Sequence, residues 1–297
     1  MNVKRFLLFG ADGQVGWELQ RAFAPFGEVQ PLTQAEVDLT DAAALRAAIR
    51  SAKPTAILNA AAYTAVDKAE ADPEVARAVN ATAAALMAEE AKALGAWLIH
   101  YSTDYVFDGT KAGTYTEDDP AHPQSVYGRT KYEGEQAIAA SGVSHLTLRT
   151  SWVFGPHGGN FLKTMLRLAR ERDELSVVAD QVGAPTSAEL LADVTAHALR
   201  SALAGRIDSG LYHLAAAGET SWHGYANAVV TEARALGAEI KLTPERIKAI
   251  TTEQYPLPAP RPKNSRLDCG RISRALDLEL PDWRWHVRRT LKELLQP

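Results

Sequence analysis

The stretch SVYGRTKYEGE, residues 125–135, places a phenol and an ammonium four residues apart, at Tyr127 and Lys131. On an α-helix, side chains at i and i+4 share one face, so the two groups would point to the same place. A phenol can donate a proton to an oxygen that gains negative charge, and a nearby ammonium lowers the phenol's pKa from its ordinary value of about 10. The same spacing also occurs on ordinary exposed helix faces. Only the rest of the chain can indicate whether Tyr127 and Lys131 have a catalytic role.

Three glycines near the N-terminus indicate a dinucleotide site. Gly10, Gly13 and Gly16 follow a short apolar run and precede a stretch with helical spacing of apolar residues. Glycine permits a tight turn and lets backbone N–H groups approach a pyrophosphate at the helix N-terminus, where the dipole favours negative charge. Because the glycines lie at the first strand–helix junction, we favour cofactor binding over a purely structural turn.

A hydroxyl side chain completes the predicted chemistry. Thr103 ends a predicted strand, and ligands of doubly wound sheets bind beyond the carboxyl ends of the strands. A ketone that accepts hydride becomes an alkoxide, which needs a proton donor. Thr103 would polarise the carbonyl, Tyr127 would donate the proton, and Lys131 would sustain the tyrosine and reach the nicotinamide ribose. A polar strand end is common in any α/β protein, so this interpretation depends on the glycines.

The elements that must position these residues alternate between strands and helices. Apolar runs predict strands, and 3.6-residue spacing predicts helices between them. The strands are expected at 5–10, 28–32, 55–62, 97–103 and 145–151, and the helices at 14–27, 41–54 and 73–95, with a further helix, capped by Ser125, that carries Tyr127 and Lys131. This order predicts an α/β protein with a Rossmann-type doubly wound parallel sheet.

Beyond residue 152 the alternation becomes less regular. Strands are expected at 175–180 and 210–215, and helices at 160–172, 187–203, 221–237 and 281–295. The stretch 251–267 is rich in proline and reads as irregular. We expect residues 1–152 to form a dinucleotide-binding core, to which part of 175–220 returns, and residues 153–297 to form mainly a smaller C-terminal substrate-binding lobe.

The composition limits the partners. The chain has 297 residues, a net charge of −4 and a pI near 6.1, which argue against a nucleic acid or an anionic membrane as partner. No basic and then apolar leader and no apolar run near 18 residues is present, so we expect a cytoplasmic protein. The single cysteine, Cys269, excludes an intrachain disulfide and fits a reducing compartment.

The sequence leaves the choice between NADH and NADPH open. An acid about 20 residues beyond the glycines usually holds the ribose 2′-hydroxyl of NAD. Here the second strand ends at PLTQ, with neither an acid nor an arginine. Asp38 comes several residues later and could lie near the adenine, or it could only start the following helix.

Several segments together resemble a known family. NAAAYTAVDKAE (59–70), YSTDYVFDG (101–109), YGRTK (127–131) and RTSWVFG (149–155) are similar to the extended short-chain dehydrogenase/reductase family. DQVGAPTSAELLAD (180–193) and YPLPAPRPKNSRL (255–267) more narrowly resemble its dTDP-4-dehydrorhamnose reductases. The resemblance implies NAD(P)H-dependent reduction of the C4 ketone of dTDP-4-dehydro-L-rhamnose to dTDP-L-rhamnose, the last step of dTDP-rhamnose synthesis.

The resemblance also implies roles for single residues. The catalytic residues would be Thr103, Tyr127 and Lys131. The cofactor would be bound by Gly10, Gly13, Gln14, Val15, Gly16, Asp38, Leu39, Ala60, Ala61, Ala62, Tyr127 and Lys131. The substrate would be bound by Thr103, Asp104, Tyr105, Trp152, Arg261, Lys263 and Asn264. An indole suits the face of a pyranose, and a basic pair suits a diphosphate; a core tryptophan and a solvated turn are the alternatives.

Some relatives are described as homodimers whose interface carries glutamates around Mg²⁺. Glu18, Glu189 and Glu293 fall at matching positions, and carboxylate oxygens are suitable Mg²⁺ ligands. Three glutamates far apart in sequence can equally be ordinary surface residues.

Two rival functions remain at this stage. An epimerase or dehydratase of the same family would oxidise and re-reduce one substrate on a retained cofactor, and Asp104 stands where a dehydratase needs an added acid. A regulatory subunit resembling that of methionine adenosyltransferase would bind a partner enzyme without catalysis. The intact set of Thr103, Tyr127 and Lys131 argues against the second.

Overall fold

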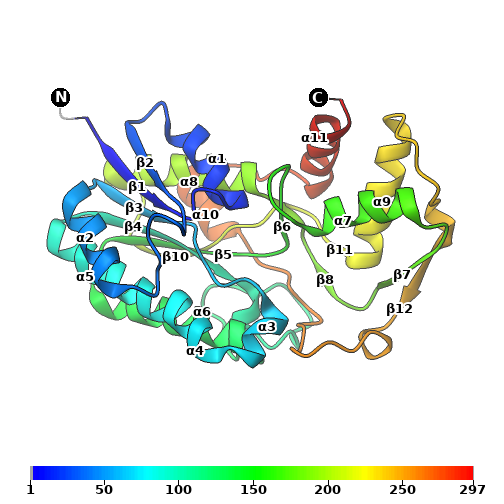
Figure 1. Ribbon diagram of the computed structural model, residues 1–297, viewed down its shortest axis with the longest axis horizontal. Coiled ribbons are helices and arrows are strands. Elements are labelled where there is room, and N and C mark those ends of the chain that lie inside the picture. Colours follow the sequence, from blue (N-terminus) through cyan, green and yellow to red (C-terminus); the bar gives the residue numbers. More distant parts are fainter. Residues whose placement is uncertain (1–2, 297) are drawn as a thin grey trace.

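A six-stranded parallel sheet forms the centre of the molecule in the computed structural model, which describes residues 3–296 (Figure 1). In spatial order its strands are β10 (Gly210–His213), β5 (His145–Thr150), β4 (Trp97–Thr103), β3 (Ala56–Asn59), β1 (Arg5–Phe9) and β2 (Glu28–Leu32). All neighbouring strands pair in parallel. The strand order reverses beside β1, which creates a switch point where ligands of such sheets bind. The predicted Rossmann-type fold is confirmed.

Successive residues of β1 point to opposite faces of the sheet and bury two cores. Phe6 and Leu8 pack with one set of helices, whereas Leu7 and Phe9 pack with the other. The first set contains α1 (Gln14–Phe23), α8 (Ala188–Leu203) and α10 (Gly270–Leu276). The second contains α2 (Ala42–Ala52), α5 (Ala83–Leu94) and α6 (Val126–Ser141). Figure 1 shows α1 and α8 on one side of the sheet and α2, α5 and α6 on the other.

The helix predicted over 73–95 is not uniform. It comprises α4 (Pro73–Arg77), a π-helical turn (Ala78–Thr82) and α5. A short helix, α3 (Val66–Ala71), precedes it and was not predicted. Single π-turns often mark functional positions, because the extra residue displaces one side chain from the regular helical pattern. Here the displaced region contains the buried Asn80.

The remaining elements form a lobe beside the sheet. In Figure 1, α7 (Phe161–Glu171), α9 (Trp222–Ala235), β7 (Leu175–Val178) and β12 (Ile247–Ile250) lie together, away from β1–β4. β7 pairs in parallel with β12. Two short pairs, β6 (Val153–Phe154) with β9 (Thr186–Ser187) and β8 (Val182–Gly183) with β11 (Thr220–Ser221), lead into the lobe. The chain closes with α11 (Trp283–Leu295). Residues 153–296 thus supply both the lobe and elements of the sheet layer, and the division near residue 152 stays a prediction.

Candidate active site

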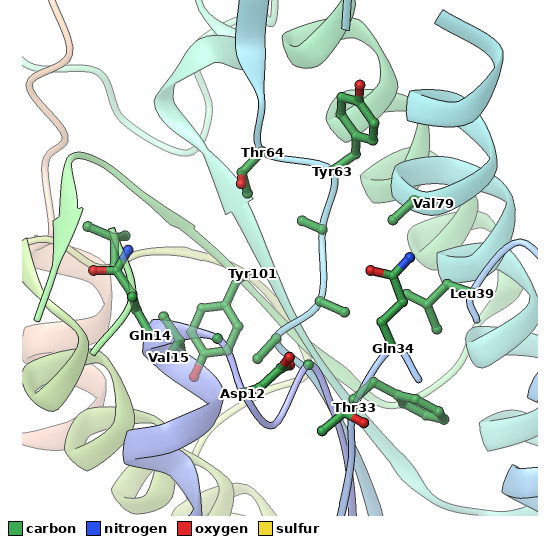
Figure 2. A pocket seen from close by; sticks show the side chains of 18 of the residues that line it. Asp12, Gln14, Val15, Thr33, Gln34, Leu39, Tyr63, Thr64, Val79 and Tyr101 are labelled. Carbon is green, nitrogen blue, oxygen red and sulfur yellow. The ribbon is translucent and has the colours of Figure 1, made fainter. Parts of the chain in front are cut away.

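A cavity of about 790 Å³ opens at the carboxyl ends of β1, β3 and β4 (Figure 2). Of the residues predicted to bind the cofactor, all but Gly16 line it: Gly10, Gly13, Gln14, Val15, Asp38, Leu39, Ala60, Ala61, Ala62, Tyr127 and Lys131. In Figure 2, Gln14 and Val15 lie across the cavity from Thr33, Gln34 and Leu39. The glycine motif therefore lies at the same elongated site that the carboxyl ends of the strands form.

Two glycines explain why this turn can lie against the next strand. Gly10 has φ +77°, and a Cβ there would lie 2.7 Å from the backbone nitrogen of Ala61. A Cβ on Gly16 would lie 1.9 Å from the Gly10 carbonyl oxygen. Gly16 does not line the cavity; instead it lets α1 begin directly against the turn. α1 starts at Gly13 without a side-chain cap, so its first N–H groups are left for an anion.

The loop after β6 covers part of this cavity and was missed in the sequence. Gly158 and Gly159 line the cavity, and Asn160 caps α7 by accepting from the backbone N–H of Lys163. The amide of Asn160 also donates to Gln14 Oε1 at 2.9 Å. The only signal was the pair of glycines in PHGGN, which has no regular spacing relative to the first motif. Further lining residues that were missed include Asp12, Thr33, Gln34, Thr40, Tyr63, Thr64, Val75, Val79, Tyr101, Ser102, Thr150 and Val153.

The helix α6 places Tyr127 in its first turn and Lys131 one turn later, both facing the cavity. Ser125 caps this helix by accepting from the Gly128 N–H at 3.1 Å, as predicted. Tyr127 packs edge-on against Tyr105, with ring centroids 5.5 Å apart. The four-residue spacing of Tyr127 and Lys131 therefore does place both side chains at one site, as the sequence suggested.

Asn80, on the π-turn, connects the cavity wall to α6. Its Oδ1 accepts from the Tyr63 N–H at 2.9 Å, and its Nδ2 donates to the Tyr63 carbonyl at 3.2 Å and to Thr130 Oγ1 at 3.1 Å. Thr130 in turn donates to the carbonyl of Tyr127. One buried amide thus holds the loop after β3 at a fixed distance from the helix that carries the tyrosine.

Burial raises the pKa of Tyr127 to about 12; the Thr103 hydroxyl opposes this shift and the Asp104 carboxylate adds to it. The net shift is thus upward, and the lowering of this pKa by Lys131 that the sequence suggested stays a prediction. Desolvation disfavours the phenolate, and the lysine is engaged elsewhere. A phenol with this pKa keeps its proton at neutral pH and is available only as an acid.

Lys131 is almost fully buried, and its Nζ donates to the carbonyl oxygen of Tyr101 at 2.5 Å. The same atom lies 3.3 Å from His100 Nε2. Burial lowers the pKa of Lys131 to about 8, and the charge of Glu135 acts in the opposite direction. The lysine therefore titrates close to neutral pH rather than carrying a permanent charge.

Thr103 ends β4 beneath Tyr127, but its hydroxyl is already used. It donates to Asp104 Oδ1 at 3.1 Å and accepts from the Tyr105 N–H at 3.1 Å. Asp104 is 2% exposed, and its Oδ2 has no hydrogen-bond partner of good geometry within residues 3–296. Burial raises its pKa to about 6, against the opposing effect of the Ser265 and Thr103 hydroxyls. Thr103 can donate to a carbonyl only after it releases Asp104, which protonation of that carboxyl favours.

A second cavity, of about 520 Å³, lies in the lobe. Its walls come mainly from apolar side chains of α7, β7, α9 and the proline-rich segment: Tyr105, Phe161, Thr164, Met165, Leu168, Leu175, Ser176, Val177, Val178, Gln181, Trp222, Thr252, Tyr255, Pro256, Leu257, Ala259, Pro260 and Arg261. Tyr105 belongs to this cavity, whereas its neighbour Tyr127 belongs to the first. The two cavities therefore approach each other at this pair of aromatic rings.

Arg261 is the predicted basic residue that lines the second cavity. It pairs with Asp67 at 2.7 Å, and its guanidinium lies 6.0 Å from the Tyr105 ring centroid. Lys263 lines neither cavity and instead pairs with Asp180 and Glu253.

Asn264 and Trp152 are occupied in ways that the sequence did not indicate. The amide of Asn264 donates to the carbonyls of Lys111 and Gly113, and its oxygen accepts from Arg266. Trp152 stacks on Trp222 at 3.7 Å and lines neither cavity. The substrate roles of both residues stay predictions.

The three glutamates predicted as magnesium ligands do not form one site. Glu18 accepts from Arg21 at 2.9 Å, and Glu189 accepts from Arg289 at 2.8 Å. Within residues 3–296 no group of three or more acidic, histidine or cysteine side chains is arranged to hold a metal. The geometry of the described residues therefore does not support the predicted Mg²⁺ site, and Glu18 and Glu189 already have cationic partners. The site was expected at a dimer interface, where it stays a prediction.

Comparison with known proteins agrees with this geometry. Residues 4–296 match the model of the family described as RmlD substrate binding domain. The dTDP-4-dehydrorhamnose reductase of Escherichia coli strain K12 is 50% identical over 298 residues, which cover 99% of this chain and 98% of that protein. The one from Burkholderia thailandensis is 49% identical over 295 residues, which cover 98% and 99%.

A solved structure shows the same arrangement. The crystal structure of dTDP-4-dehydrorhamnose reductase from Bacillus anthracis in complex with NADP has a TM-score of 0.89 at 32% identity and covers 98% of this chain and 100% of that chain. The resemblance inferred from the sequence is confirmed. The chain therefore belongs to the RmlD family, whose relatives compared above carry the name dTDP-4-dehydrorhamnose reductase.

Proposed function

We propose that this protein reduces the C4 ketone of dTDP-4-dehydro-L-rhamnose to dTDP-L-rhamnose with a reduced nicotinamide. The observation that carries the proposal is the position of Tyr127, which lines a glycine-walled cavity of dinucleotide type and touches Tyr105 of the second cavity. A reacting carbon between the two cavities would meet a proton donor. The names of the relatives, at about 50% identity over almost the whole chain, support the same reaction.

The chain's own groups divide the chemistry. A nicotinamide bound in the larger cavity would supply the hydride. Tyr127 holds its proton at neutral pH and gives it to the oxygen that develops negative charge. Lys131, which faces the same cavity, returns a proton to the tyrosine after each transfer. Thr103 orients the carbonyl once Asp104 accepts a proton.

The second cavity suits the thymidine end of the substrate. A pyrimidine base buries well among Phe161, Met165 and Trp222. Arg261 lies at the side of this cavity nearest Tyr105, where a guanidinium can bind diphosphate oxygens bidentately. The diphosphate would then take the place of Asp67 beside this guanidinium.

Turnover with purified protein tests the proposal. Nicotinamide absorbance should fall when dTDP-4-dehydro-L-rhamnose is added, one equivalent of cofactor being consumed for each sugar. UDP-linked or unphosphorylated sugars serve as controls. No consumption with the dTDP-sugar would refute the proposal.

The same assay separates the rivals. An epimerase or dehydratase would convert its substrate without net loss of reduced cofactor, and a regulatory subunit would be inactive on every sugar nucleotide. The residue after Asp104 is Tyr105, whose ring contacts Tyr127, so this position offers no second acid for dehydration.

We further propose that NADH binds more tightly than NADPH. Beyond β2, Glu36 accepts from Thr33 N–H and Oγ1, and Asp38 accepts from Thr40 N–H and Oγ1. A 2′-phosphate there would meet the carboxylate of Asp38, with that of Glu36 close by on Thr33, and Lys131 is the only cationic residue in the described lining of this cavity. The dissociation constant should be about tenfold lower for NADH, and Gln34→Arg should reverse the order; equal affinities in the parent protein would contradict this proposal.

Location and assembly stay predictions. None of the described helices is both long and apolar enough to cross a bilayer. A homodimer is expected from the resemblance alone, and light scattering at micromolar concentration, with and without EDTA, would test both the dimer and its dependence on a divalent metal.

A further inference from the structure

A buried chain of hydrogen-bonding groups runs beneath Lys131, and the reaction as proposed above does not use it. Asn59 ends β3, and His100 lies next to it on β4; both are 1% exposed. Asn59 Nδ2 lies 3.0 Å from His100 Nδ1, and His100 Nε2 lies 3.3 Å from Lys131 Nζ. Because Asn59 and His100 are buried away from water, they must share their protons with each other and with Lys131.

The proton positions follow from counting donors. Asn59 Oδ1 accepts from the backbone N–H of Ala61 at 3.3 Å, so the amide NH₂ of Asn59 faces the imidazole. His100 Nδ1 must therefore be the acceptor. Burial pushes the pKa of His100 well below its usual range, so the ring is neutral and, with Nδ1 accepting, carries its single proton on Nε2.

An Nε2–H bond then points at Lys131. An ammonium has no lone pair to receive it, whereas a neutral amine has one. The amine can still donate to the Tyr101 carbonyl, which lies 2.5 Å from Nζ. When Lys131 is protonated, the imidazole must move its proton to Nδ1 and the Asn59 amide must turn over, which breaks the bond to Ala61. The chain thus has two proton arrangements, and they differ in the charge of Lys131.

We propose that His100, fixed by Asn59, is a positioning residue that makes Lys131 an exchangeable proton carrier instead of a permanent cation. The proposal rests on the proposed reduction. Tyr127 gives its proton to the new alcohol oxygen, the phenolate takes a proton from the ammonium of Lys131, and the neutral amine that remains accepts the His100 Nε2–H bond. A proton from solvent in the cavity restores the ammonium, so one proton enters for each ketone reduced.

The other charged groups around Lys131 do not replace this role. Glu135, one turn further on α6, forms a buried bidentate pair with Arg149 of β5 at 2.6 and 2.8 Å, so most of its charge is compensated. His145, at the start of β5, affects the pKa of His100 and not that of Lys131. Of the side chains facing Lys131, His100 is the one whose proton position depends on the lysine's charge.

Two variants and one spectrum test the proposal. Asn59→Asp replaces the amide donor by a carboxylate that accepts from Nδ1–H, which frees Nε2 to accept from the ammonium. His100→Gln offers Lys131 an amide oxygen. Activity requires protonated Lys131 and falls as pH rises through its pKa, so both variants should move this alkaline limb of kcat upward, by about one pH unit for Asn59→Asp. His145→Gln, a matched change on the neighbouring strand, should leave the limb in place.

The tautomer can be read without substrate or cofactor. A long-range ¹H–¹⁵N spectrum of histidine-labelled protein should show His100 with its proton on Nε2 at high pH, and on Nδ1 once Lys131 is protonated. An Nδ1–H tautomer throughout would overturn the proposal, as would variants that lower kcat equally at every pH. Because this spectrum needs no sugar nucleotide, it remains informative if dTDP-4-dehydro-L-rhamnose proves not to be the substrate.

Discussion

The two cavities are lined by different kinds of groups. The walls of the larger cavity are in large part backbone and small side chains, including Gly10, Gly13 and the alanines at 60–62. The second cavity is walled by large side chains such as Phe161 and Trp222, which come from segments far apart in the sequence. Its outer residues Tyr255 and Leu257 are 56% and 41% exposed.

This difference determines how each cavity responds to change. A wall of backbone has no rotamers with which to adapt, so one added methyl group collides with atoms that cannot move. A wall of side chains can repack, and it loses affinity by degrees. Variants of matched size in the two cavities should therefore have very unequal effects.

The largest effect is expected for Gly16→Ala. The added Cβ would lie 1.9 Å from the Gly10 carbonyl, so α1 must move away from the turn. We expect a loss of about 3 kcal/mol in the free energy of unfolding and at least a hundredfold weaker NADH binding, measured by thermal denaturation and by cofactor fluorescence. Gly113→Ala, where a Cβ meets nothing within 4 Å, is the control. Normal cofactor affinity in Gly16→Ala would show that the backbone wall does adapt.

Tyr127→Phe should lower kcat by roughly 10³-fold, because it removes the proton donor but leaves the cavity shape intact. The NADH dissociation constant should change by less than about twofold. Tyr132→Phe, at a tyrosine on the same helix that packs against the buried Val106, Phe107 and Tyr115, controls for a general effect of losing a hydroxyl. Retention of a tenth or more of the activity by Tyr127→Phe would exclude this tyrosine as the acid.

Trp222→Ala tests the side-chain wall. The indole stacks on Trp152 and donates to Gln181 at 3.1 Å, and its loss should raise KM for the dTDP-sugar by about 10–30-fold with no change in NADH affinity. Trp222→Phe should recover most of the affinity, because this wall can repack. Equal losses in both variants would mean that the lobe is as inflexible as the glycine turn.

Asp104, between the two cavities, should show the smallest effect, and one with a pH signature. Its pKa is about 6 in the folded protein against an ordinary 3.8, so the folded state binds this proton more tightly than the unfolded state. The folded protein therefore loses stability as pH rises from about 4 to 6, and it does not regain it above 6. Asp104→Asn, whose amide oxygen can still accept from Thr103, should gain about 1 kcal/mol at pH 8 and almost nothing at pH 4. Calorimetry at the two pH values would measure this; an equal shift at both would contradict the burial argument.

The same difference explains what could be predicted from the sequence. The glycine turn, the strand ends and the pair Tyr127–Lys131 obey fixed spacings, because backbone geometry and helical periodicity impose them. No spacing relates Phe161, Trp222 and Leu257, which meet only after the lobe has folded. The engagement of Asn264, Lys263 and Glu189 with protein partners was likewise invisible, because a sequence does not indicate which neighbours a polar side chain will have.

The π-turn at Ala78–Thr82 has a consequence for variation among homologues. A π-turn holds one residue more than the α-helix it interrupts, so a single-residue deletion there would heal the helix and rotate Asn80 by about 100° relative to its partners. Tyr63 and Thr130 would then both lose their hydrogen bonds to the side-chain amide of Asn80. Chains of this fold that are one residue shorter at this point need another tether between the cavity wall and the tyrosine helix, and the length of this segment is thus a simple marker for how that helix is held.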